Sequence, residues 1–326
     1  MAFDKRADPN GELLVVKSEV EHDKRAKALI EELHLQELRR LLAALAEASV
    51  PVLITKGTAL AYSLYSEPFL RERFDTDLFI SHRDVEKAFA ALTKAGFTKV
   101  NSNSEVHRQA VFTVTDRRGI RHAFDIHWAP LTPIALSKIL DFDQAFAASV
   151  AIPSVSETAR RLNDIDSLIL ACVHWAGHHF LEPDPRWIAD ITLLCEGKSQ
   201  KWWLEAEAAF KAKKVASIGA ATLKLAKEEA HAQIPDSVIS SLESVEDETD
   251  AKYFLSESRT KFKDFIWDVR CLHTTSEKLK FIHSHLFPPA EYMNSKYGST
   301  TGVRRIFNQI NRIVRGAPKL KSKTRP

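Results

Sequence analysis

Two aspartates, Asp75 and Asp77, stand one residue apart in the stretch RFDTDLFI, directly before an apolar run. If this stretch is a strand, both carboxylates lie on one face, because successive side chains of a strand point to opposite faces. Like charges held that close raise each other's pKa and repel unless a cation lies between them. The pair therefore indicates a divalent-cation site, and the plainer alternative is a strand that begins in a polar turn.

A third carboxylate follows in AFDIHW, where Asp125 lies between Phe124 and Ile126 in a predicted strand. A free carboxylate in the middle of a strand is costly unless it is paired or bound to metal. Three acids on neighbouring strands can hold two Mg²⁺ ions, of which one activates a hydroxyl and the other grips a triphosphate. The pattern thus favours phosphoryl or nucleotidyl transfer, with an NTP as substrate and with Mn²⁺ able to replace Mg²⁺.

Such a site also needs a cradle for phosphate. Lys56, Gly57 and Thr58 lie where the first predicted strand meets its helix. Glycine lets the backbone approach an anion, and the N–H groups at a helix N-terminus point toward it. The threonine adds a hydroxyl and the lysine a charge, although a turn glycine beside a surface lysine is the alternative.

The elements that position these acids follow from hydrophobic periodicity. Leucines at spacings of three and four predict one long or two shorter helices over residues 18–49. The pattern then predicts strands at 50–54 and 74–80, a helix at 84–95 capped by Ser81 and ended by Gly96, and a hairpin of 109–115 with 120–128. We expect a mixed sheet of four or five strands flanked by helices and ending near Val150.

Beyond that point the periodicity is helical almost throughout. Pro153 and the polar residues 154–158 suggest a linker, and an acidic loop is expected at 243–250. Helices are expected at 163–180, 187–196, 201–232, 251–273 and 302–315. The predicted fold class is therefore α+β, with a sheet domain over 1–150 and an all-helical domain over 151–326 that ends in a basic tail.

Composition limits the possible partners and location. The chain has 326 residues, 44% hydrophobic and 27% charged, with a net charge of +3 that is too small to indicate nucleic-acid binding. The N-terminus lacks the basic start and apolar run of a signal peptide, and no stretch of 18 apolar residues occurs. Three widely spaced cysteines suggest neither a disulfide framework nor a zinc site, so a reducing cytoplasm is expected.

At the level of motifs the chain resembles the uncharacterised bacterial nucleotidyltransferase family of the DNA polymerase β superfamily. The resemblance extends from about residue 50 to about residue 300 and is carried, in order, by ITKGTALAYSLY, FLRERFDTDLFI, HAFDIHW, HWAGHHF, RWIADITLL and LFPPAEYMNSKYG. The K-G element with the following D-x-D, and the D-x-H-W strand, are the most specific parts. In the wider superfamily the strand-to-helix turn usually reads Gly-Gly or Gly-Ser, whereas here it reads Gly57-Thr58.

The resemblance implies a Mg²⁺-dependent nucleotidyltransferase that moves an NMP from an NTP to a hydroxyl acceptor and releases pyrophosphate. It implies that Asp75 and Asp77 are paired metal ligands and that Asp125 is the third carboxylate. Arg71 matches an arginine common in the family, and a bidentate phosphate clamp or a salt bridge to Asp77 or Glu72 would explain it. His127 shares the face of Asp125, where it would order that face or bind a ligand.

Two other functions stay open. The first is a catalytically degenerate member that binds a nucleotide or a partner without chemistry. The second is a metal-dependent phosphohydrolase built on His174, His178 and His179, with Asp184 and Asp190 completing the site. Against the hydrolase, the His-Asp dipeptide typical of helical phosphohydrolases is absent from these residues, and packing explains the histidines more simply.

The C-terminal residues 304–325 contain eight basic side chains and no acid. They could bind RNA phosphates, but a solvated helix end with a tail is favoured because Phe307 is the sole aromatic side chain there. The acceptor, the base preference and the oligomeric state do not follow from the sequence.

Overall fold

A seven-stranded mixed sheet forms the framework of the N-terminal half in our computed structural model, which describes residues 9–100 and 108–287 without the side chains of residues 9–22. The described strands are β1 (Val52–Thr55), β2 (Thr76–Ile80), β3 (Thr98–Val100), β4 (Gln109–Thr115), β5 (Arg121–His127), β6 (Val150–Ala151) and β7 (Arg160–Arg161). Their spatial order is β3-β4-β5-β2-β1-β7-β6. Strands β2 and β5 are parallel neighbours although β3 and β4 lie between them along the chain.

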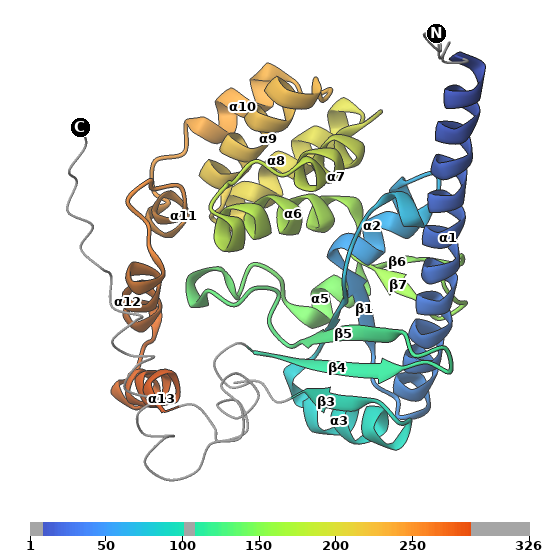
Figure 1. Cartoon of the computed structure of the whole chain (residues 1–326). Helices are drawn as coiled ribbons and strands as arrows, with labels where there is room; N and C mark the ends of the chain where they lie inside the picture. Colours follow the sequence, from blue (N-terminus) through green and yellow to red (C-terminus); the bar gives the residue numbers. More distant parts are fainter. Residues whose placement is uncertain (1–8, 101–107, 288–326) are drawn as a thin grey trace, which may run out of the picture.

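One face of the sheet is covered by helices α1 and α3. The 39-residue α1 (Pro9–Glu47) lies beside the sheet (Figure 1). The leucines of its C-terminal half belong to the buried cluster there, and α3 (Val85–Lys94) packs against the same helix. The alternation of β2 and β5 supplies the sheet side of this core, with Leu78, Ile80, Phe124 and Ile126 all buried. Asp77 and Asp125 must therefore point to the opposite face.

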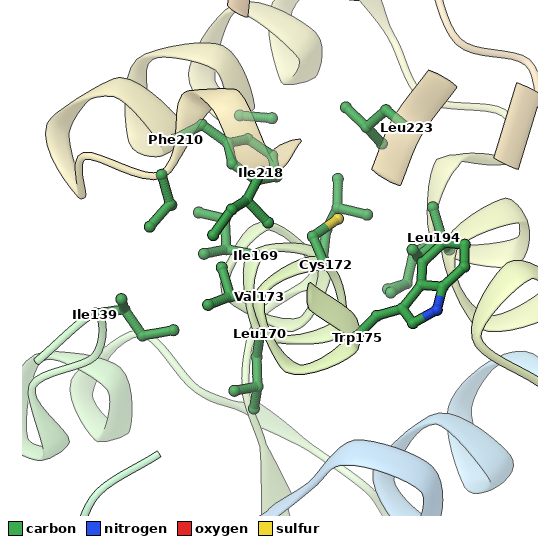
Figure 2. Close-up of a cluster of buried hydrophobic side chains, with 14 of the residues drawn as sticks. Ile139, Ile169, Leu170, Cys172, Val173, Trp175, Leu194, Phe210, Ile218 and Leu223 are labelled. Carbon is green, nitrogen blue, oxygen red and sulfur yellow. The ribbon is translucent and has the colours of Figure 1, made fainter. Parts of the chain in front are cut away.

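The helical half packs on that opposite face. Its helices are α6 (Asp164–His179), α7 (Pro185–Cys195), α8 (Gln200–Ala212), α9 (Ala216–Ala230), α10 (Asp236–Glu243), α11 (Thr249–Phe254), α12 (Lys261–Cys271) and α13 (Thr275–Leu286). Helix α6 lies at the centre of their core, where its buried side chains are surrounded by Leu194 of α7, Phe210 of α8 and Leu223 of α9 (Figure 2). The same buried cluster includes Leu53, Leu60 and Phe79 from the sheet half, so the two halves share one core.

The remaining short elements connect these layers. Helix α2 (Lys56–Leu64) follows β1 directly and α5 (Phe142–Ala147) precedes β6. The short 3-10 turns are η1 (Pro68–Leu70), η2 (His82–Asp84) and η3 (Ile134–Leu136). No helix among the described residues combines the length and the apolar character that crossing a bilayer requires.

Most of the expected elements are present, including the hairpin of β4 with β5 and the end of α3. Gly96 follows that helix with φ +86°, and the backbone N–H of Phe97 donates to the carbonyl of Leu92. Ser81 is placed before the 3-10 turn η2 but makes no capping hydrogen bond with its side chain, so its expected capping role is wrong.

Four expectations about the elements and their boundaries are also wrong. The sheet has seven described strands rather than four or five, because residues 150–151 and 160–161 add a short hairpin at its edge. The segment 153–158 closes that hairpin and is not a free linker. The helix expected over 201–232 breaks at Lys214, which takes φ +55°, and the helix expected over 251–273 breaks between α11 and α12.

Candidate active site

The parallel pairing of β2 with β5 brings two of the predicted carboxylates together. Asp77 lies directly opposite Asp125 in the register, and both side chains face the helical half of the molecule. Asp75 precedes the first residue of β2 and lines the same cavity. The structure thus gathers all three predicted acids from segments that lie about fifty residues apart in the chain.

The cavity has a volume of about 310 Å³ and lies between the sheet and helices α6 and α7. From the sheet half it is lined by Lys56, Gly57, Arg71, Glu72, Arg73, Phe74, Asp75, Asp77, Gln109, Asp125 and His127. From the helical half it is lined by His174, His178, His179, Arg186 and Trp187. Such a cleft between two packed layers is where ligands commonly bind.

Asp77 is the most tightly held of the three acids. Lys56 Nζ donates to Asp77 Oδ1 at 2.7 Å, and His127 Nε2 lies 2.7 Å from the same oxygen. Burial alone would raise the pKa of Asp77, but the charge of Lys56 and the contact with His127 outweigh it and hold that pKa well below its usual range. These two partners therefore favour the ionised form of Asp77.

Asp125 has the opposite electrostatic environment. Within the described part of the chain its carboxylate has no hydrogen-bond or ion-pair partner, and burial together with Asp77 and Asp75 raises its pKa to about 7. The pKa of Asp75 is raised as well, first by burial and then by Asp77. An unpartnered, half-buried carboxylate beside two others is the arrangement that a divalent cation relieves.

The residues present fit a metal ion. Asp77, Asp125 and His127 each offer a ligand atom, and these atoms lie within 4.8 Å of one another. The ammonium of Lys56 already occupies a cation's place against Asp77, which shows that the site accepts positive charge. Asp75 lies outside this group of three but lines the same cavity.

Two of the three residues predicted to bind phosphate, Lys56 and Gly57, line the cavity, and Thr58 does not. Lys56 and Gly57 line the cavity at the start of α2, and Lys56 takes the left-handed backbone conformation with φ +52°. Thr58 instead lies on the other side of that turn and is 1% exposed. Its hydroxyl meets Thr76 Oγ1 at 2.9 Å and accepts from Arg73 Nε at 3.0 Å, so it helps to hold the loop before β2 rather than line the cavity.

Arg71 is engaged by a residue far along the chain. Its Nε and Nη2 donate to the two carboxylate oxygens of Asp190 at 2.8 and 2.7 Å, and its Nη1 donates to the carbonyl of Glu72 at 2.6 Å. The salt bridge expected with Asp77 or Glu72 is therefore wrong in its partner. The guanidinium still borders the cavity beside Gly57, but its bidentate fork is directed at Asp190.

The histidines of α6 form a wall of rings opposite the carboxylates. His174 stacks on His178 with ring centres 5.0 Å apart, and His179 packs on Trp187 at 4.7 Å. Burial is the main cause that lowers the pKa of His178 to about 3, so its ring is neutral and its Nε2 accepts from the backbone N–H of Thr132 at 3.4 Å. These rings pack as aromatic side chains do.

The two acids that a hydrolase site on α6 would use already have other partners. Asp184 is bound to Arg186 and Asp190 to Arg71. Across the described residues, the grouping of possible metal ligands includes none of the α6 histidines. The structure therefore gives the phosphohydrolase alternative no support. The basic residues 304–325 lie outside the described residues.

Two features of the site were missed or underrated. The contact of Lys56 with Asp77 was not expected, and only the position of the lysine directly after Thr55, which pairs with Asp77 in the register of β1 with β2, could have indicated it. Alternation along β5 did place His127 on the face of Asp125, but its approach to Asp77 depends on the pairing of β5 with β2.

Taken together, a mixed sheet that presents paired carboxylates beside the start of a helix is an arrangement for metal-assisted chemistry on phosphates. The family model of the uncharacterised nucleotidyltransferases matches residues 12–230. The chain belongs to this family, as the motifs indicated.

Two further comparisons complete this result. No curated protein matches the chain. A solved structure, the solution structure of the antibiotic-resistance factor ANT(2'')-Ia, is similar with 14% sequence identity and a TM-score of 0.41, over 57% of this chain and 95% of that one.

Proposed function

We propose that the protein is a Mg²⁺-dependent nucleotidyltransferase that transfers an NMP from an NTP to a hydroxyl acceptor and releases pyrophosphate. The observation that carries this proposal is the convergence of Asp75, Asp77 and Asp125 on one cavity beside the start of α2. Membership in the nucleotidyltransferase family supports it. In this proposal the sheet half is the catalytic domain, over 1–150, and the helical half closes the cleft.

In this proposal the carboxylates bind metal and the start of α2 binds the triphosphate. Asp75 and Asp77 would hold both ions and Asp125 would hold the ion that activates the acceptor, while Gly57 would let the triphosphate approach the first N–H groups of α2. When bound, two Mg²⁺ ions lower the pKa of the acceptor hydroxyl and neutralise the charge on the phosphates. The acceptor oxygen would bond to the α-phosphorus as its proton passes to solvent water, and the bond to the pyrophosphate would break with its electron pair leaving on the pyrophosphate.

The cations around the cavity have defined roles in this proposal. Lys56 is paired with Asp77, and we propose that it turns to the triphosphate once metal neutralises that carboxylate. Arg71 is held by Asp190 and braces the wall on which the phosphates lie. Thr58, which is buried behind the turn, shapes that wall through Arg73.

The test is transfer of label from a panel of α-labelled NTPs, with Mg²⁺ or Mn²⁺ and with cell extract as the source of acceptor. The Asp75→Asn, Asp77→Asn variant is the control. Label that moves to one product class only when both aspartates are intact supports the proposal and identifies the acceptor class. A variant that transfers label as well as the natural chain would contradict it.

A degenerate, binding-only protein is the second candidate, because the ammonium of Lys56 already neutralises Asp77 without metal. Nucleotide binding by calorimetry separates the two. Binding that is tight and metal-dependent, with no release of pyrophosphate in any extract, would favour the binding function.

A further inference from the structure

We propose that His127 is a nitrogen ligand of the cation held by Asp77 and Asp125, and that this site binds Mn²⁺ more tightly than Mg²⁺. The inference deepens the proposed function, because it concerns the metal of the same site. It adds an imidazole to a set of ligands that otherwise consists of carboxylates.

The sheet fixes the place of the imidazole. His127 follows Asp125 by two residues on β5, so both side chains point to the cavity face. The parallel register sets Asp77 beside Asp125 and sets Phe79 beside His127, which brings the ring over the carboxylate of the neighbouring strand. No loop is involved, and a site built on paired strands is held more rigidly than one on loops.

The ring nitrogen points at the place where a cation would bind. His127 Nε2 lies 2.7 Å from Asp77 Oδ1, the same oxygen that Lys56 Nζ approaches to 2.7 Å. The side chain is 8% exposed and lines the cavity, so the ring can meet a bound ion without leaving its packed position. In the metal-free protein His127 Nε2–H donates to the ionised Asp77; a cation in this place would displace that proton, so that the ring keeps its proton on Nδ1 and turns the Nε2 lone pair to the ion.

The alternative is that His127 only orients Asp77 by donating a hydrogen bond. That role would leave the ion with oxygen ligands alone. The grouping of one atom each from Asp77, Asp125 and His127 within 4.8 Å favours direct ligation, because three donors that close converge on a common point. Asp75 is not in this group, so we assign the nitrogen to the ion that Asp125 would hold with Asp77, and not to the other ion.

The ligand set determines the metal. Mg²⁺ takes oxygen ligands almost exclusively and binds few protein side chains, whereas imidazole suits first-row transition metals. Mn²⁺ accepts nitrogen and also shares the preference of Mg²⁺ for carboxylate oxygen. Two carboxylates with one imidazole therefore favour Mn²⁺ over Mg²⁺.

The experiment is pulsed electron paramagnetic resonance of Mn²⁺ bound to the full chain, with the metal alone as the probe. We expect modulation from one ¹⁴N nucleus in the natural chain, replaced by ¹⁵N coupling when the histidines are labelled with ¹⁵N. The labelled protein tests for a histidine ligand without any substitution. His127→Gln is expected to lose the coupling and to lower the Mn²⁺-over-Mg²⁺ affinity ratio about tenfold, in line with losses at ligand shells.

His179→Gln is the matched control, because His179 lines the same cavity but is not in the ligand group. It is expected to keep the nitrogen coupling. Absence of coupling in the natural chain, coupling that survives in His127→Gln, or no Mn²⁺ binding at all would each overturn the inference.

These outcomes are separable from the fate of the proposed function. Mn²⁺ bound through Asp77 without nitrogen coupling would contradict the assignment of His127 as a ligand but would not contradict the proposed transferase function. Nitrogen coupling without any nucleotide transfer would support the ligand assignment and contradict the proposed transferase function.

Discussion

Arg71 and Asp190 form a buried two-point ion pair that joins the sheet side of the cavity to helix α7. The side chains are 4% and 2% exposed, and Tyr65 Oη donates a third hydrogen bond to Asp190 Oδ1 at 2.8 Å. The two partners lie 119 residues apart in the sequence. The pair fixes Trp187 and the α6 histidines opposite the carboxylates, because Arg71 also lies over the ring of Trp187 with 5.4 Å to its centre.

Breaking this pair is expected to destabilise the fold. Arg71→Met leaves the carboxylate of Asp190 buried without its partner, and the loss of one member of a buried pair costs about 3–5 kcal/mol. Urea unfolding followed by circular dichroism measures the change. Arg186→Met is the control, since its pair with Asp184 is 40% and 23% exposed and is expected to cost less than about 1 kcal/mol. Equal losses in the two variants would contradict the bracing role of Arg71.

The local chemistry of the site was readable from the sequence, because it depends on short-range rules. Alternation along a strand put Asp75 with Asp77, and it put Asp125 with His127, on one face each. The turn of Asp116 to Gly119 gave the hairpin that carries Asp125, and Gly119 has the positive φ of 84° that such a turn requires.

What the sequence could not provide is the set of contacts between distant segments. Nothing local says that β5 lies beside β2, or that Arg71 meets Asp190 rather than a phosphate. The break at Lys214 was hidden because neither proline nor glycine marks it in the sequence. Non-local pairing also explains the underrated role of His127, whose approach to Asp77 exists only once the two strands are parallel neighbours.

Removing the charge of Lys56 is expected to strengthen metal binding and weaken nucleotide binding. Its ammonium competes with a cation for Asp77 Oδ1 in the nucleotide-free protein. In Lys56→Met the competition ends, and a charged hydrogen bond worth about 1.5–3 kcal/mol predicts roughly tenfold or more tighter Mn²⁺ binding at pH 8.

Titration calorimetry with Mn²⁺ and then with an NTP measures both effects of Lys56→Met. The NTP affinity should fall because the triphosphate loses a positive partner. Arg160→Met, which is far from the cavity at β7, is the control and is expected to change neither affinity. Weaker binding of both ligands by Lys56→Met would show that the lysine only orders the site.

Gly57→Ala is expected to separate binding from stability. An added methyl would lie 3.6 Å from Arg71 Nη2, which is ordinary contact, so the melting temperature should stay within about 2 °C of the natural value. The methyl would nevertheless stand where the backbone meets a phosphate, and we expect about tenfold weaker NTP binding.

The control for Gly57→Ala is Gly119→Ala, where φ is +84° and no heavy atom of a neighbour lies within 4 Å of the new methyl. Backbone strain there should cost about 1 kcal/mol of stability and leave NTP affinity unchanged. Gly57→Ala should thus weaken NTP binding without a loss of stability, whereas Gly119→Ala should lower stability without weakening NTP binding. If Gly57→Ala binds NTP normally, the triphosphate does not approach the start of α2.

Metal affinity is expected to depend on pH through Asp125. Burial and the neighbouring carboxylates raise the pKa of Asp125 from its ordinary value to about 7, so below that pH a proton competes with the cation. Affinity should fall roughly tenfold per pH unit below 7 and level off above it, because one proton must leave for each ion bound.

The folding stability of the metal-free protein is expected to depend on pH in the opposite direction to metal affinity. A carboxyl whose folded pKa lies above its unfolded value binds more protons when folded, so its contribution to stability rises as the pH falls from about 8 toward 4. Calorimetry in buffers of different ionisation enthalpy counts the proton released on Mn²⁺ binding at pH 6. Melting curves at pH 6 and 8 should show the contribution of Asp125 to stability falling with pH without Mn²⁺, and the stabilisation by Mn²⁺ rising with pH. Asp125→Asn should release no proton and lose this pH dependence. Affinity that stays constant between pH 6 and 8 in the natural chain would mean that Asp125 does not bind the ion.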